Sequence, residues 1–225
     1  MNERILMIET STDCCSVAVS DGDRIAAVRV DETPRQQSAM LAPHIVEVLQ
    51  EAALTPHDLD AVAVSEGPGS YTGLRVGVST AKGICFGAGI PLIGIDTLQI
   101  LACQATGSFD RIVAMLDARR MEVYAAPFDA NACKLADTAA VILNADSYRQ
   151  ELEAERVLFI GTGAAKFQNI CTHPHASFQP CFPHAAAMLQ PALAALQKKE
   201  FKDVAYFEPF YLKEFVAGVS KHAIL

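Results

Sequence analysis

A glycine-rich segment at residues 67–73 is the feature that most restricts how this chain can fold. The segment reads Gly-Pro-Gly-Ser-Tyr-Thr-Gly and follows Asp60–Ser65, an apolar run with the length of a buried strand. After it, apolar residues recur every three to four positions up to Phe86, which predicts a helix with Thr72 as its N-cap. The segment therefore predicts a sharp turn from a strand into a helix, the basic connection of an α/β protein.

Strands and helices are predicted to alternate along the rest of the chain. Apolar runs bounded by turn residues, such as Asp21-Gly22, indicate strands. Each half of the chain opens with an apolar strand that ends in a carboxylate, Glu9 or Asp117, and turns back into a second strand. This similarity suggests an internal repeat. We expect strands at residues 4–9, 14–20, 24–31, 60–65, 91–95, 112–117, 121–128 and 155–161, and helices at residues 36–53, 72–86 and 184–197.

The composition fits a globular protein with a large aliphatic core. Of the 225 residues, 51% are hydrophobic and 20% are charged, and the net charge is −8. A chain that binds nucleic acid by itself usually carries a basic surface. The basic residues here form only pairs, such as Arg119-Arg120 and Lys198-Lys199. We therefore expect another subunit to hold any RNA.

Several features predict a cytoplasmic protein with no membrane contact. The start, Met1–Arg4, runs directly into the first apolar strand and has no leader-peptide pattern. The seven cysteines contain no C-x-x-C pair, which is typical of reduced thiols that pack as small hydrophobes. No window approaches the roughly 18–20 apolar residues of a membrane helix.

Three segments, in their order and spacing, resemble one family. They are Ile5–Thr12 with the following Cys15–Ala18, then Gly67–Gly77, and then Asp117–Tyr124. The chain resembles the TsaB family of bacterial tRNA threonylcarbamoyladenosine biosynthesis proteins, most closely over residues 4–125. The run Glu208–Leu212 is also similar to that family.

The resemblance implies an actin-like, sugar-kinase-like ATPase fold of the α/β class, which is related to ribonuclease H. Such a fold has two related subdomains, each with a mixed β-sheet flanked by helices. We expect the first at residues 1–105 and the second, smaller and more divergent, at residues 106–225. The resemblance also implies a non-catalytic subunit that binds and stabilises a paralogous threonylcarbamoyl transferase. A third, ATP-hydrolysing subunit completes the assembly, and tRNA is contacted only indirectly.

Two positions depart from the family pattern. Glu9 stands where an aspartate is usual, which moves the carboxylate by one methylene group. Gln37 stands where relatives often have histidine. Both changes weaken the expectation of catalytic chemistry more than they weaken the expectation of the family's fold.

Two segments are candidates for contact with the phosphates of ATP or ADP, and no other cofactor is expected. Glycines let backbone N–H groups approach an anion, and a helix N-terminus adds partial positive charge. The spacing matches neither G-x-x-x-x-G-K-[ST] nor G-x-G-x-x-G, so a purely structural loop is the competing interpretation. The candidate residues are Glu9, Thr10, Ser11, Thr12, Gly67, Gly69 and Ser70.

The alternative function is that of a stand-alone enzyme, either an ATP-dependent phosphotransferase or a glycoprotease-like metallopeptidase. The first would need a phosphate loop with a lysine, which is missing from the glycine-rich segment. The second would need histidine ligands, and the six histidines form neither H-E-x-x-H nor the H-x-x-x-H spacing of catalytic relatives. We therefore predict no catalytic residue and no metal ligand.

The helices predicted at residues 36–53 and 72–86 have apolar faces wider than the stripe of about 100° on a typical surface helix. Gly73, Gly77 and Ala81 lie one turn apart and form a small-residue stripe that would let another helix approach. The extra apolar surface is either covered within the chain or binds a partner protein, and we favour a partner. When the chain is alone, the same surface predicts a homodimer. The predicted interface is Leu41, Ile45, Val48, Gly73, Val76, Gly77, Thr80, Ala81 and Ile84.

Overall fold

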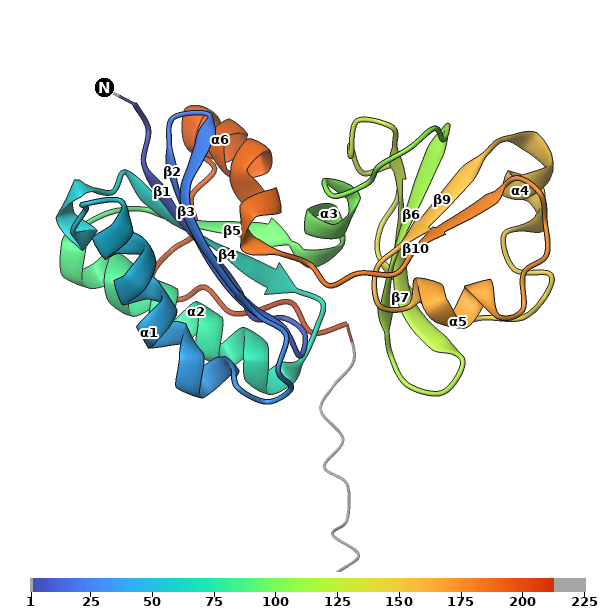
Figure 1. Ribbon diagram of the computed structural model, residues 1–225, viewed down its shortest axis with the longest axis horizontal. Helices are drawn as coiled ribbons and strands as arrows, with labels where there is room; N and C mark the ends of the chain where they lie inside the picture. Colours follow the sequence, from blue (N-terminus) through green and yellow to red (C-terminus); the bar gives the residue numbers. More distant parts are fainter. Residues whose placement is uncertain (1, 213–225) are drawn as a thin grey trace, which may run out of the picture.

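The computed structural model describes residues 2–212 and places them in two subdomains, each built around a five-stranded sheet (Figure 1). In spatial order the first sheet contains β3 (Arg24–Asp31), β2 (Cys15–Asp21), β1 (Ile5–Glu9), β4 (Ala61–Gly67) and β5 (Leu92–Asp96). In the corresponding order the second sheet contains β8 (Ala139–Ile142), β7 (Glu122–Asp129), β6 (Arg111–Asp117), β9 (Val157–Ile160) and β10 (Ala176–Gln179).

The two sheets have the same topology. In each, the first strand of the repeat lies at the centre, antiparallel to the second strand and parallel to the fourth. The third strand extends the antiparallel side and the fifth extends the parallel side. Because β1 ends at Glu9 and β6 ends at Asp117, these carboxylates occupy equivalent positions. The predicted internal repeat is confirmed.

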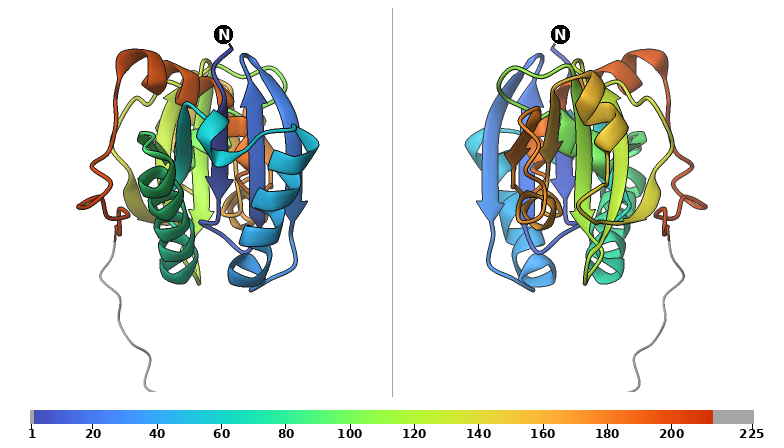
Figure 2. Two further views of the ribbon diagram at one scale, coloured as in Figure 1. Left: turned by 90° about the vertical axis from the view of Figure 1, so that its left-hand side faces the viewer. Right: turned by 90° about the vertical axis from the view of Figure 1, so that its right-hand side faces the viewer.

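Helices cover both faces of the first sheet. On one face, α1 (Gln37–Glu51) and α2 (Tyr71–Ala88) lie side by side and bury aliphatic side chains of β1, β2 and β4 (Figures 1 and 2). On the other face lie η2 (Ala185–Met188) and α6 (Leu189–Lys198). All five residues of β1 are buried, as expected for a central strand covered on both sides.

The second sheet is also covered on both faces. α3 (Thr97–Ala102) packs on one face, and α4 (Arg149–Ala154) and α5 (Ala164–Gln168) pack on the other. α3 also contacts β4 and β5 and therefore joins the two subdomains. The remaining short helical turn, η1 (Pro56–Asp58), precedes β4.

The end of the described chain returns to the first subdomain, which corrects the predicted division into residues 1–105 and 106–225. Met188, Ala192 and Leu193 are buried against Ile5 and Met7 of β1. The second sheet is complete once β10 has formed, so the apolar residues of α6 are free to cover the open face of the first sheet. Residues 213–225 of the predicted second subdomain lie outside the described residues.

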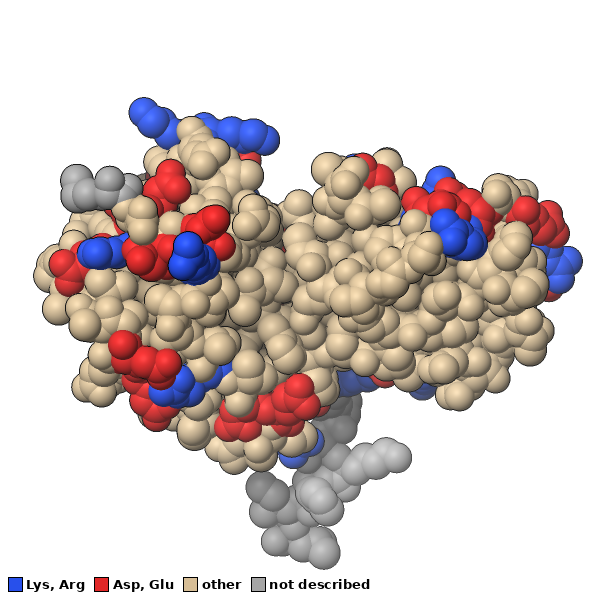
Figure 3. Space-filling model, turned by 45° about the horizontal axis from the view of Figure 1, so that its top comes forward, with Lys and Arg blue, Asp and Glu red and all other residues tan. Residues whose placement is uncertain are grey.

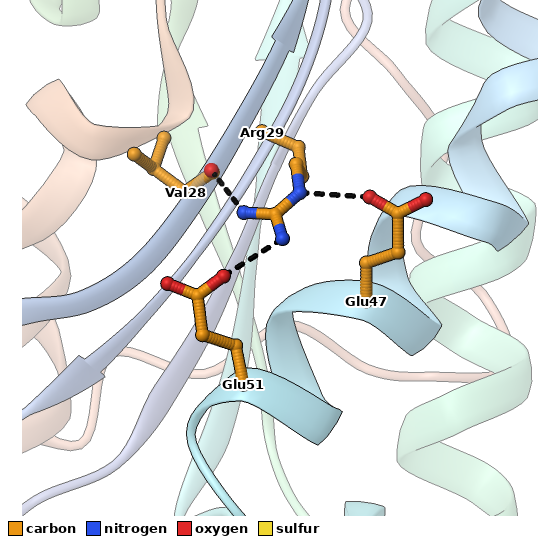
Figure 4. A network of polar contacts seen from close by, with 4 residues as sticks. All are labelled: Val28, Arg29, Glu47 and Glu51. Carbon is orange, nitrogen blue, oxygen red and sulfur yellow. Dashed lines mark hydrogen bonds and ion pairs between the residues drawn. The ribbon is translucent and has the colours of Figure 1, made fainter.

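An ion-pair network holds α1 against β3, an edge strand of the first sheet (Figure 4). Arg29 of β3 donates from Nε to Glu47 Oε2 and from Nη2 to Glu51 Oε2, both at 2.7 Å. Its Nη1 donates to the backbone carbonyl of Val28 at 2.9 Å. The guanidinium therefore positions α1 and also occupies a carbonyl of the edge strand, which disfavours pairing with another strand.

The predicted helices are present, with two corrections. α2 begins at Tyr71, and its N-cap is Ser70 rather than Thr72, because the Ser70 hydroxyl accepts the N–H of Gly73 at 3.3 Å. The helix predicted at residues 184–197 is a short η2 turn followed by α6. The short elements α3, α4, α5, β8 and β10 were not predicted from the sequence.

Ser16 tests the contact that returns the C-terminal part of the chain to the first sheet. Its buried hydroxyl accepts the N–H of Ala185 at 2.9 Å. Replacing it, Ser16→Ala, leaves a buried donor without a partner, so we expect the free energy of unfolding to fall by about 1–3 kcal/mol. Chemical denaturation measures this change. Ser79→Ala, at an exposed position of α2, is the control and should leave the stability unchanged.

Candidate functional site

Glu9 marks the place where an actin-like fold would position its phosphate site, at the end of the central strand β1. Its carboxylate is fully buried, and Oε1 accepts the backbone N–H of Ser11 at 2.5 Å. Glu9 Oε2, Ser11 Oγ and Ser65 Oγ are buried and have no hydrogen-bond partner among the described residues. The carboxylate is therefore shielded from solvent.

Burial controls the protonation of this group. It raises the pKa of the Glu9 carboxyl to about 7, because the charged form loses its hydration, and interactions with Ser11 and Ser65 lower the pKa only in part. Near neutral pH a large share of the carboxyl is therefore uncharged. A neutral or half-neutral carboxyl is a poor ligand for a nucleotide-bound cation.

The turn after β1 is packed against the first turns of α2. Thr10 Oγ1 donates to the carbonyl of Gly73 at 2.8 Å. A Cβ atom at Gly73 would lie 2.0 Å from the Thr10 carbonyl oxygen, and one at Gly77 would lie 2.3 Å from Thr10 Oγ1. Any side chain at either position would collide with the turn. The glycines allow two segments of backbone to touch.

The glycine-rich loop makes the same kind of contact one turn earlier. Ser70 donates its N–H to the carbonyl of Ser11 at 2.6 Å, and a Cβ atom at Gly69 would lie 2.4 Å from that oxygen. Gly67 has a φ of +111°, and the carbonyl of Phe210 fills the space beside its Cα. The loop is thus closed by the turn after β1 and by the C-terminal segment.

The predicted phosphate-contact residues are partly engaged within the chain. Glu9, Thr10 and Ser11 are buried, and the N–H groups of Ser11 and Ser70 are bonded within the chain. The carbonyl of Thr12 accepts Nε2 of Gln37 at 2.5 Å, which gives the departure at position 37 a structural role. Within the predicted set, Ser11 contacts Glu9, Gly69 and Ser70. Ser70 is exposed and Thr12 is half-buried. The full set predicted for phosphate contact is Glu9, Thr10, Ser11, Thr12, Gly67, Gly69 and Ser70.

The C-terminal segment, residues 205–211, contacts the glycine-rich loop and α2. Phe210 donates its N–H to the carbonyl of Glu66 at 2.7 Å, and the ring of Tyr211 lies 5.0 Å from that of Tyr71. Lys82 of α2 donates to the carbonyls of Ala205 and Phe207. These contacts place the run Glu208–Leu212 against the glycine-rich segment.

The predicted partner interface also needs correction. Six of its nine residues are buried inside the chain: Leu41, Ile45, Val48, Gly73, Gly77 and Ala81. The stripe Gly73–Gly77–Ala81 packs on the turn after β1 and on β4, so it is not available to another helix. Val76, Thr80 and Ile84 remain half-buried at the edge of the outer face.

A different set of small and apolar residues faces outward on the two helices. On α2, Ser79, Gly83 and Gly87 lie one turn apart and exposed, and a Cβ atom at Gly83 or Gly87 would meet nothing within 4 Å. Beside them Phe86 is 85% exposed, and on α1 Val46 is 52% exposed. This set was not predicted, although Ser79, Gly83 and Gly87 follow the spacing i, i+4, i+8 in the sequence.

Two surface cavities lie away from this region. One of about 350 Å³ is lined by the N-terminal residues, Asp21 and Asp60, and one of about 200 Å³ lies along β6, β7 and β8. Within residues 2–212, no three His, Cys, Asp or Glu side chains lie together in a way that would bind a metal ion. In the same range, no helix combines the length and apolarity needed to cross a membrane.

Comparison with known proteins decides the family. The sequence model of the tRNA N6-adenosine threonylcarbamoyltransferase family, TsaD, matches residues 31–219. The tRNA threonylcarbamoyladenosine biosynthesis protein TsaB of Escherichia coli K12 is 30% identical to this chain, over 95% of this chain and 96% of the relative. The chain belongs to the TsaB family. The TsaB protein of Haemophilus influenzae is 28% identical over similar shares, 96% and 95%.

Solved structures agree with this membership of the TsaB family. A Pseudomonas aeruginosa protein described as similar to the peptidase YEAZ has a TM-score of 0.84 and 27% identity, covering 94% of this chain and all of that chain. An activator of 2-hydroxyisocaproyl-CoA dehydratase from Clostridium difficile has a TM-score of 0.50 and 9% identity, covering 89% of this chain and 98% of that chain, and shows the fold alone. The predicted actin-like, sugar-kinase-like fold is confirmed.

Glu9, which replaces the aspartate expected in the TsaB family, makes stability depend on pH. The unfolded chain loses this proton near pH 4.5, whereas the folded chain holds it up to about pH 7. The unfolding free energy contributed by this group therefore falls as pH rises between these values and is constant above them. Glu9→Gln removes this pH dependence. Between pH 4.5 and pH 7, the free energy of unfolding of the variant should therefore rise by on the order of 3 kcal/mol relative to that of the wild type.

Denaturation curves at several pH values measure this difference. Glu153→Gln, at an exposed position of α4, is the control and should parallel the wild type. A constant difference between Glu9→Gln and the wild type across the range would contradict the buried, neutral carboxyl.

Proposed function

We propose that this chain takes part in tRNA threonylcarbamoyladenosine biosynthesis as a non-catalytic subunit that binds and stabilises a TsaD-like transferase paralogue. A third, ATP-hydrolysing subunit completes the proposed assembly, in which another subunit holds the tRNA. The proposal places the chain in the cytoplasm. It is supported by membership of the TsaB family and by the match to the TsaD sequence model.

The outer face of the α1–α2 pair is the observation that carries this proposal. It combines Phe86 and Val46, which are largely exposed, with Gly83 and Gly87, where the helix surface is flat. Large apolar side chains beside small residues suit close packing against another helix, and exposed aromatic side chains are frequent anchors of interfaces. The Arg29 network joins α1 to β3.

The closed loop next to Glu9 supports a scaffold rather than an enzyme. A catalytic phosphate site needs backbone donors that point at the ligand. Here the N–H groups of Ser11 and Ser70 are bonded to Glu9 and to the carbonyl of Ser11. A stand-alone phosphotransferase or metallopeptidase is therefore the weaker candidate.

A homodimer through the same face is the second candidate. The same exposed helices would pair with themselves in the absence of the paralogue. Sedimentation of the chain alone and with the paralogue distinguishes the cases: a homodimer that the paralogue dissociates supports one shared face, and a homodimer that persists in the complex opposes it.

Two glycines of α2 provide a matched test of the interface. Gly83→Leu adds a side chain at an open, exposed position, so the fold should keep its stability or gain up to about 1 kcal/mol from helix propensity. Binding of the paralogue should weaken by about 2 kcal/mol or more, because the side chain prevents close helix packing. Tm and a binding titration measure both effects, and tRNA modification by the reconstituted complex should fall in parallel.

Gly77→Leu is the contrasting variant. Its side chain would overlap Thr10, so we expect the free energy of unfolding to fall by about 1–3 kcal/mol or more. Unchanged affinity of Gly83→Leu for the paralogue would refute the proposed interface, whatever the effect of Gly77→Leu on stability.

A further inference from the structure

The turn between β6 and β7 carries two adjacent arginines in an unusual backbone conformation. Arg119 and Arg120 have φ values of +73° and +51°, in the left-handed region that L side chains rarely adopt. Turns with two such residues usually use asparagine and glycine. Both arginines are exposed at the end of the hairpin. The chain keeps two long cationic side chains where small residues would fit the backbone better.

These arginines also lack the partners that most other arginines have. Arg4, Arg24, Arg29, Arg111, Arg149 and Arg156 pair with carboxylates, and Arg75 lies over Tyr71 and bonds Tyr211. Among residues 2–212, the guanidinium groups of Arg119 and Arg120 make no such contact, and Arg35 is the remaining arginine without one. On the face drawn in Figure 3, most basic side chains lie beside acidic ones.

The base of the hairpin holds this turn in place. Asp117 Oδ1 accepts the backbone N–H of Arg119 at 2.6 Å and Nζ of Lys166 at 2.7 Å. Lys166 also donates to the carbonyl of Glu122, and the N–H of Asp117 donates to the hydroxyl of Thr162. The Asp117 carboxylate is therefore engaged by Lys166 and by the backbone N–H of Arg119.

We infer that the Arg119–Arg120 turn is a direct contact for the phosphate backbone of RNA, in the orientation that the transferase paralogue gives the tRNA. Planar guanidinium groups bind phosphate oxygens bidentately. A projecting turn can reach a phosphate although the chain as a whole carries a charge of −8. The inference rests on the proposed function and departs from the expectation that tRNA is contacted only indirectly. An acidic protein surface would fit the same turn and is an outcome of the test.

The test uses the double variant Arg119→Asn/Arg120→Gly in the complex with the paralogue. The affinity for unmodified tRNA is measured between about 50 and about 200 mM salt. Each lost phosphate contact should reduce the magnitude of the slope of log affinity against log salt concentration by about 0.7–0.9. The slope of the double variant should therefore be smaller in magnitude than that of the wild type by about 1.4–1.8. Its Tm should equal or exceed that of the wild type, since asparagine and glycine accept the left-handed backbone.

A matched control removes the same charge elsewhere. Lys198→Gln/Lys199→Gly also deletes two exposed cations, and Lys199 has a φ of +57° at the end of α6. This pair has a structural reason to be basic, because cations are favourable at a helix C-terminus. The slope should stay at the wild-type value in this control.

Three results would overturn the inference. They are an unchanged slope in the arginine variant, an equal decrease in both variants, and loss of the paralogue by the arginine variant alone, which would assign the turn to a protein contact. If the wild-type chain fails to bind the paralogue, the proposed function fails instead. The same two variants are then compared on the chain alone, where equal affinities for tRNA would overturn the inference as well.

Discussion

The contact between the turn after β1 and the first turns of α2 is the constraint on which the rest of the structure depends. Thr10 and Ser11 touch Gly69, Gly73 and Gly77 at distances that exclude any side chain. The contact fixes the angle at which α2 leaves the sheet. It also determines which side of α2 is buried, and therefore which side is left for a partner.

The same contact brings the turn after β1 against the glycine-rich loop, where the phosphate contact is predicted. The backbone N–H groups of Ser11 and Ser70 are bonded to Glu9 and to the carbonyl of Ser11. Glu9 is buried, and burial raises its pKa to about 7, so a large share of the carboxyl is uncharged near neutral pH. Tight packing at this point favours rigidity of the first subdomain, which suits a subunit that presents a fixed surface.

Much of this architecture was predictable from the sequence, because it depends on local patterns. The apolar strands, the hairpin at Asp21-Gly22 and the turn at Gly67 follow from composition and spacing, and the carboxylates Glu9 and Asp117 revealed the repeat. The orientation of α2 was not predictable. The helix carries small residues on two sides, and periodicity alone cannot tell which side meets the sheet. Likewise, nothing local indicates that α6 returns to the first sheet, since its apolar face would suit either.

Side-chain footprinting of the complex with the transferase paralogue tests the central claim most directly. Hydroxyl radicals label exposed side chains, and Phe86 is 85% exposed on α2, whereas Ile142 is 72% exposed on β8 in the second subdomain. If the outer face of α1 and α2 binds the paralogue, labelling of Phe86 and Val46 should fall strongly in the complex while labelling of Ile142 stays constant. Unchanged labelling of Phe86 in a complex that demonstrably forms would contradict the account.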